Sequence, residues 1–126
     1  MTREINVLTD VALITCVVQR GAADAIVTAA QSAGAQGATV HFGRGSGVRE
    51  RLRVLGVAVD VEKEIINIVV SSEQVDRVFE KIYLAGGLDT PGMGIMYVTP
   101  LEKAATYIPP DFMERVTKRR GTQGVD

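Results

Sequence analysis

The side chains that most often carry catalysis are scarce in this sequence. There is one cysteine, Cys16, and one histidine, His41, and a cysteine–histidine nucleophile pair needs both side chains in one cleft. Cys16 lies within an apolar run, which predicts a small buried residue. One histidine does not make a stable metal site, which needs three or four ligands, so we expect a structural or solvent-facing role for His41. The carboxylates of Glu62, Glu64 and Glu73 show no acid–base pairing and are expected to be solvated.

Glycine is the residue type in excess. The chain has 13 glycines among 126 residues, against a usual share of about 7%. Ten of them lie in a first glycine window, 34–56, and a second glycine window, 86–94. Alternating glycines let backbone N–H groups point into a concavity and let a ligand approach closely.

The first glycine window is also rich in positive charge. It contains four arginines: Arg44, Arg49, Arg51 and Arg53. The guanidinium group offers a planar fork of donors that suits phosphate or carboxylate. A solvated hairpin loop is the alternative interpretation. The second window, which includes 90–94, is by itself typical of a plain turn between a helix and a strand.

The elements that must position these windows alternate between strands and helices. Runs rich in β-branched residues predict strands, and apolar residues at helical spacing predict helices. Gly34 and Gly86 are natural helix ends. The expected strands are 11–18, 37–42, 57–70 and 95–99. The expected helices are 22–33 and one that starts after Ser71 and ends at Gly86. A short edge strand over 101–107 and a terminal helix over 111–120 are expected to follow.

Two local signals refine these boundaries. Ser71 and Gln74 have the spacing of a capping box, in which the serine hydroxyl and the glutamine amide satisfy first-turn N–H groups. Pro100 is expected to stop the last strand, because proline cannot donate to a sheet ladder.

The resulting order, β-α-β-β-α-β, predicts a ferredoxin-like α+β sandwich with two helices on one face of an antiparallel sheet. The first and third strands do not alternate between apolar and polar residues, so both sheet faces require burial. We therefore expect a homo-oligomer that packs its sheet faces together, the alternative being a monomer with an exposed valine-rich face. Across a subunit boundary the two glycine windows could then form one anion or nucleotide pocket.

Several motifs resemble the PII-like signal-transduction proteins of the nitrogen regulatory P-II family. The order and spacing of the matching segments agree over most of residues 13–108. The segments are Gly37-Ala-Thr-Val40, Gly45-Ser-Gly47, Lys63, Ile68-Val-Val70, Gly92-Met-Gly94 and Tyr97-Val-Thr-Pro-Leu-Glu-Lys103. The resemblance implies a homotrimer with sheets packed toward the centre. It also implies a domain over 1–108, a T-loop at about 43–58 and a C-terminal extension over 109–126.

The resemblance further implies an adenine nucleotide held between subunits. By matching position, Gly37, Thr39 and Val69 surround the base. The ribose and phosphates contact the backbone of Gly45, Ser46 and Gly47 and the second phosphate loop, Gly92, Met93 and Gly94. Lys63 matches a cationic position near the cleft, and Arg49, Arg51 or Lys103 is a candidate to compensate for lost charge. The loop arginines Arg44, Arg49, Arg51 and Arg53 are expected to face a target protein.

The chain also departs from the family pattern. Met93 and Ile95 stand where the phosphate loop usually has aspartate and lysine, and Thr106 and Ile108 replace two arginines. Three cations near a triphosphate are thereby lost, so AMP, ADP or cyclic AMP is as reasonable an effector as ATP. The T-loop is about five residues short and has no tyrosine between positions 48 and 62, which removes the family's loop modification. Arg49 replaces the usual glutamine, so 2-oxoglutarate and Mg²⁺ sensing is not expected.

Composition excludes other functions. A net charge of -1 argues against a nucleic-acid binder, and the aliphatic central strands lack the aromatic platform of an RNA-recognition module.

We expect a cytoplasmic, non-catalytic regulator that is not embedded in a membrane and has no catalytic cofactor. Its target would be a transporter or a metabolic enzyme, in nitrogen or inorganic-carbon metabolism. The alternative is a small acylphosphatase-like enzyme with an arginine-bearing phosphate loop.

Overall fold

The elements of the chain follow the order expected from the sequence. A computed structural model describes residues 5–45 and 61–107. In chain order the elements are β1 (Val7–Leu8), β2 (Val11–Gln19), α1 (Ala23–Ser32), β3 (Thr39–Gly45), β4 (Val61–Ser71), a short 3-10 helix η1 (Ser72–Gln74), α3 (Val75–Ala85), β5 (Gly94–Leu101) and β6 (Ala104–Ala105).

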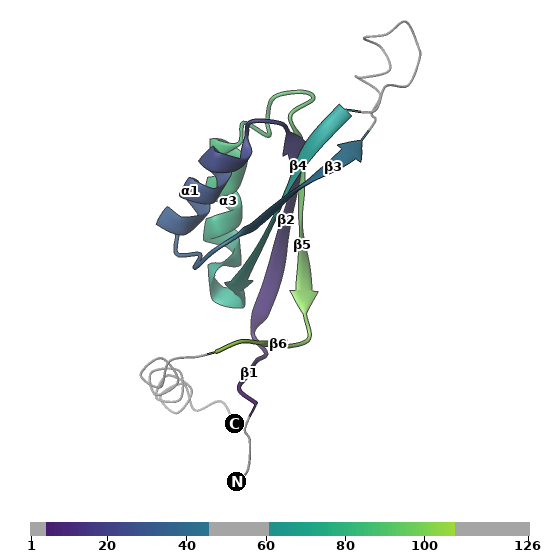
Figure 1. Cartoon of the computed structure of the whole chain (residues 1–126). Coiled ribbons are helices and arrows are strands. Elements are labelled where there is room, and N and C mark those ends of the chain that lie inside the picture. Colours follow the sequence, from purple (N-terminus) through teal and green to yellow (C-terminus); the bar gives the residue numbers. More distant parts are fainter. Residues whose placement is uncertain (1–4, 46–60, 108–126) are drawn as a thin grey trace, which may run out of the picture.

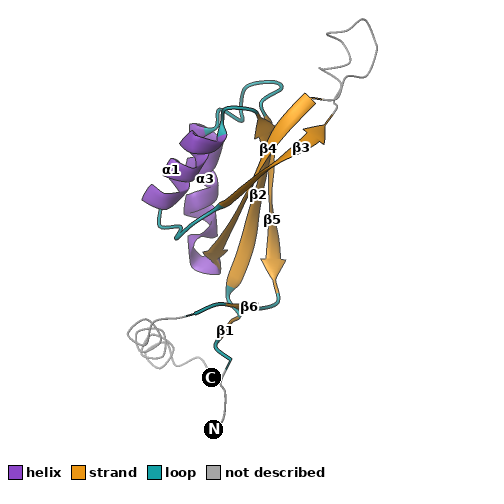
Figure 2. Ribbon diagram, viewed as in Figure 1, coloured by secondary structure: helices purple, strands orange, loops and turns teal. Residues whose placement is uncertain are grey.

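The four long strands form one antiparallel sheet in the order β3-β4-β2-β5. Helices α1 and α3 lie side by side on one face of it (Figure 1). The orange strands and purple helices of Figure 2 thus form two layers, and the predicted ferredoxin-like sandwich is confirmed. The strands β2 and β4, which carry the longest apolar runs, occupy the two central positions.

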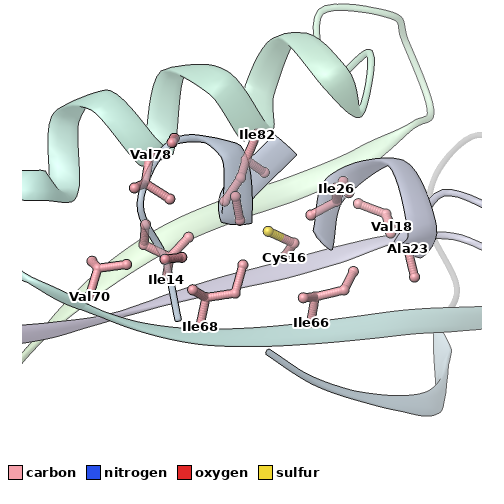
Figure 3. Close-up of a cluster of buried hydrophobic side chains, with 13 residues drawn as sticks. Ile14, Cys16, Val18, Ala23, Ile26, Ile66, Ile68, Val70, Val78 and Ile82 are labelled. Carbon is pink, nitrogen blue, oxygen red and sulfur yellow. The ribbon is translucent and has the colours of Figure 1, made fainter. Parts of the chain in front are cut away.

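The core lies between the sheet and the helices (Figure 3). Alternate residues of β2 point into it, including Ile14, Cys16 and Val18, each of them fully buried. Helix α3 contributes Val78 and Ile82, which are also fully buried. The predicted role of Cys16 as a small core residue is confirmed, and burial raises the pKa of its thiol from the usual 9.0 to about 11.

Several predicted boundaries differ from the structure. Strand β3 begins two residues later and ends three residues later than expected, and β4 covers 61–71 of the predicted strand, whose first four residues lie outside the described ranges. The capping-box prediction is wrong: Ser71 makes no side-chain cap hydrogen bond, and the chain enters α3 through η1. Gly34 follows α1 with φ +116°, and Gly86 is the C-cap of α3, as expected.

Two predictions at the far end of β5 are corrected. Pro100 does not end the strand but lies inside it, opposite Ala12. β5 is an edge strand, where a missing N–H can face away from the ladder. The expected edge strand over 101–107 is reduced to β6, which leaves the main sheet and pairs with β1. This two-stranded sheet lies beyond the end of the main sheet (Figure 1).

Candidate functional site

Neither of the described helices α1 and α3 covers the second face of the sheet, and we call it the open face. Register places on it the side chains that alternate with the core positions, and those between the strand ends are the ones used below. These are Thr39, His41 and Gly43 of β3, Lys63, Ile65, Asn67 and Val69 of β4, Leu13, Thr15, Val17 and Gln19 of β2, and Ile95, Tyr97 and Thr99 of β5. Apolar side chains such as Ile95 and Val69 are 61% and 45% exposed there. The face thus mixes apolar and polar side chains, and the expectation that it is buried in an assembly stays a prediction.

The two glycine windows reach the same end of the sheet, which we call the loop end. β3 finishes there at Gly45, and β5 begins there at Gly94. These two strands are the opposite edges of the sheet. Three strand spacings of about 4.8 Å separate these strands, and Gly45 also lies three residues beyond the level of Gly94, so the two glycines of one chain are about 17 Å apart.

The second glycine window is held against the end of β2 by one residue, Gln19. The Gln19 side-chain amide donates to the Gly92 carbonyl oxygen at 2.6 Å, and the Gln19 backbone N–H donates to the Met93 carbonyl oxygen at 3.1 Å. Sequence reasoning missed Gln19. Its only signal was a polar side chain that closes an apolar strand run just before a turn.

Two glycines of this turn are required by the backbone. Gly92 has φ +86° and Gly94 has φ +144°. A Cβ on Gly94 would lie 2.2 Å from the Val17 carbonyl oxygen, which is closer than a Cβ comes to any atom it is not bonded to. Only glycine therefore lets β5 start flush against β2.

Lys63 lies between the two windows on the open face. It is opposite Gly43 on one side and opposite Gln19 on the other. A Cβ on Gly45 would lie 3.3 Å from Lys63 Cγ, so the missing side chain leaves space for the lysine stem across the end of β3. The structure thus brings Gly45, Lys63 and the turn at 92–94 to one end of the sheet.

The residues predicted around the base lie further along the same face. Thr39 is opposite Asn67, two residues from Val69 on β4, and both Thr39 and Val69 are exposed. Gly37 precedes β3. Six residues of strand separate Thr39 from Gly45, a span of about 20 Å, so these residues lie away from the loop end.

The remaining predicted residues divide into two groups. Ser46, Gly47, Arg49, Arg51 and Arg53 lie outside the described residues. Arg44 lies on β3 directly opposite Glu62, on the helix side of the sheet. It lines an open hollow of about 510 Å³ together with Phe42, Gly43 and Glu62. This hollow lies on the other face from Lys63, so Arg44 is not brought to the nucleotide positions.

The prediction that the three carboxylates are merely solvated is wrong for Glu64. Its carboxylate accepts hydrogen bonds from the backbone N–H groups of Gly21 and Ala23, the latter at 3.2 Å. Helix α1 has alanine at its N-cap and no side-chain cap of its own, so Glu64 caps it from β4. Glu62 forms an exposed ion pair with Arg20 at 3.3 Å.

Within the described ranges, 5–45 and 61–107, no three His, Cys, Asp or Glu side chains are grouped so as to hold a metal ion. None of the helices described is long and apolar enough to cross a membrane.

Comparison with known proteins identifies the family. The family "Nitrogen regulatory protein P-II" matches residues 11–108. This chain belongs to the P-II family. Among solved structures it is similar to the Arabidopsis thaliana PII protein bound to citrate, with a TM-score of 0.59 and 23% identity over 75% of this chain and 79% of that one. A search of curated proteins returned no match.

Family membership fixes the general class of the protein. P-II proteins are generally trimeric, non-enzymatic regulators that bind small effectors and act on target proteins. The similarity to the Arabidopsis PII protein is one of fold. The P-II match begins at residue 11, so β1 and its pairing with β6 lie partly outside the family core.

Proposed function

We propose that this P-II protein is a homotrimeric, non-catalytic regulator that binds an adenine nucleotide between subunits and controls a target protein through the loop after β3. The observation that carries this proposal is the position of the two glycine windows. They share one end of the sheet but lie at opposite edges of it.

The end of β3 and the start of β5 lie at opposite edges of the sheet but at the same end of it, and this arrangement favours a cyclic assembly. Gly45 and Gly94 of one chain are about 17 Å apart, too far for both to contact one phosphate group. If copies are related by rotation about an axis along the strands, the β3 edge of one copy meets the β5 edge of the next. The end of β3 and the turn at 92–94 of the neighbour then face each other at the same height.

The chemistry of this junction suits a phosphate-bearing ligand of modest charge. Lys63 supplies a cation, and the glycines allow close approach to backbone N–H groups. Gln19 fixes the turn at 92–94 so that its backbone is already ordered before a ligand binds. Met93 and Ile95 supply no charge, so AMP, ADP and cyclic AMP are candidate effectors along with ATP.

Calorimetric titration with these four nucleotides, with and without 2-oxoglutarate or bicarbonate, tests the proposal. We expect binding that is weakened by Lys63→Ala and unaffected by Lys81→Ala, an exposed lysine on α3. A wild-type chain that binds none of the nucleotides at millimolar concentration would refute the pocket.

The acylphosphatase-like alternative has its own test. If the protein hydrolyses an acyl phosphate, and if Arg49→Ala abolishes that hydrolysis, the protein is an enzyme and not a non-catalytic regulator. Because the P-II family is generally non-enzymatic, we expect no turnover above the uncatalysed rate.

A further inference from the structure

One row of polar side chains crosses the open face from edge to edge. Each strand contributes one residue: Thr39 of β3, Asn67 of β4, Thr15 of β2 and Tyr97 of β5, which are paired directly in the sheet register. We call these four residues the polar row. Its members are flanked along the strands by apolar rows.

The apolar rows, each of which also holds one polar residue at an edge strand, lie immediately above and below. On the loop-end side, Ile65, Val17 and Ile95 are paired with one another, with His41 on β3 beside Ile65. On the other side Val69 is paired with Leu13, with Thr99 on β5 beside Leu13. Among the open-face residues named above, Lys63 is the only charged one, and it lies at the loop end. A face with few charges at its centre is typical of the core of a protein interface.

The polar row is internally hydrogen-bonded. The Thr15 hydroxyl donates to Asn67 Oδ1 at 2.9 Å. Asn67 Nδ2 lies 3.4 Å from Nε2 of His41, the neighbour of the row on β3. Thr15 is only 6% exposed, whereas Tyr97 is 46% exposed. The row is therefore anchored in the sheet at its centre and presents a tyrosine side chain at its β5 end.

We propose that the polar row sets the axial register of the subunits in the assembly. This inference rests on the proposed homotrimer, and the occupant of the open face is a second and third copy of this chain. Rotation about an axis along the strands keeps every residue at its height. Polar rows from all copies then meet one another, and apolar rows meet apolar rows.

The side chains suit such a meeting of identical rows. Threonine and tyrosine hydroxyls each donate and accept, and the asparagine amide does both, so the row is complementary to copies of itself. A slip by one row moves a subunit by about 7 Å along the strands. It would place Asn67 and Thr15 against Val69 and Leu13 or against Ile65 and Val17, where buried polar groups lose their partners.

Register also controls the nucleotide junction. The end of β3 in one copy and the turn at 92–94 in the next face each other only when both copies lie at the same height. A slip of about 7 Å would separate them while leaving the apolar faces in contact. Loss of the polar row should therefore leave association intact and remove ligand binding.

The test combines sedimentation velocity with nucleotide calorimetry on the full chain. For Thr15→Val/Asn67→Leu we expect retained association, with more than one species, and at least a tenfold loss of nucleotide affinity. Thr99→Val is the control, because it makes the same polar-to-apolar change on the open face outside the row, and it should keep one species and wild-type affinity. Tyr97→Phe removes a single hydroxyl from an exposed side chain without endangering the fold and should weaken binding about threefold.

Three results would overturn the inference. The double variant could form one species with wild-type affinity, it could be a folded monomer, or Thr99→Val could behave as the double variant does. If the double variant does not fold, wild-type affinity and a single species for Tyr97→Phe would overturn it. A wild type that forms trimers but binds no nucleotide would instead refute the proposed pocket, and the species distribution alone would then test the register.

Discussion

Gly94 at the start of β5 provides the sharpest test of how the turn at 92–94 is built. An alanine there would have a φ of +144°, a backbone conformation that is nearly restricted to glycine. Its Cβ would also lie 2.2 Å from the Val17 carbonyl oxygen and 2.8 Å from the Val18 Cα. Both neighbours are backbone atoms of a central strand, so neither can move aside as a flexible side chain could.

The magnitude follows from these two terms. Backbone strain of this type costs about 1–3 kcal/mol, and relief of a steric overlap within a packed sheet adds about 1–3 kcal/mol. We therefore expect Gly94→Ala to lower the free energy of unfolding by about 2–6 kcal/mol. That is a large share of the roughly 5–15 kcal/mol that stabilises a typical domain.

Gly21 offers a matched control. It also has a positive φ, +99°, but a Cβ there would meet nothing within 4 Å. Gly21→Ala should therefore show the strain alone, about 1–2 kcal/mol. The assay is urea unfolding of both variants, followed by circular dichroism and extrapolated to water. If Gly94→Ala is no more destabilising than Gly21→Ala, the close approach of β5 to β2 is not as described.

Three further predictions concern single side chains. Gln19→Ala removes one hydrogen bond to the turn at 92–94, worth about 1 kcal/mol, so calorimetry should show about a fivefold weaker nucleotide affinity, with the exposed Gln31→Ala unchanged. Glu64→Ala removes the cap of α1 and should lower the free energy of unfolding by about 1–2 kcal/mol in urea titrations; an unchanged midpoint would contradict the capping role. The raised pKa of Cys16, about 11, means that the unfolded chain loses its thiol proton first as pH rises. The contribution of the Cys16 thiol to the free energy of unfolding is therefore fully present below about pH 9 and falls by up to about 2.7 kcal/mol toward pH 11. Urea unfolding as a function of pH should show this loss in the wild type and not in Cys16→Ala.

The fold was predictable because its strongest signals are local. The nearly continuous apolar runs around Ile14 and Ile68 indicated buried strands, and the spacing of Val78 and Ile82 indicated a helix with one buried face. Predictions failed where tertiary contacts overrode a local preference. Ser71 has the spacing of a capping box, yet a 3-10 turn occupies that place. Pro100 is compatible with β5 because β5 is an edge strand, and edge position depends on the whole sheet.

The candidate site was predictable in part for a similar reason. Glycine-rich turns can be recognised from sequence, but their position at one end and two edges of the sheet depends on strand order. Gln19 and Glu64 act on segments more than 40 residues away in the sequence. A polar residue at the end of a strand carries no local sign of such a contact. The polar row has the same origin, since it exists only once four strands are aligned in register.

Ile95 connects the effector and the assembly. It stands where the family pattern usually has a lysine in the phosphate loop, and its side chain lies on the open face, 61% exposed and opposite Val17. The change that removes a cation from the proposed nucleotide junction therefore adds apolar surface to the face on which, in the proposed trimer, copies pack. Burying the exposed 61% of that side chain favours association by about 1–2 kcal/mol per subunit, whereas the lost charge weakens binding most for the most highly charged ligand. The same substitution thus favours a trimer that is stable without ligand and a nucleotide with fewer phosphates. Restoring the charge with Ile95→Lys should strengthen ATP binding more than AMP binding and weaken subunit association.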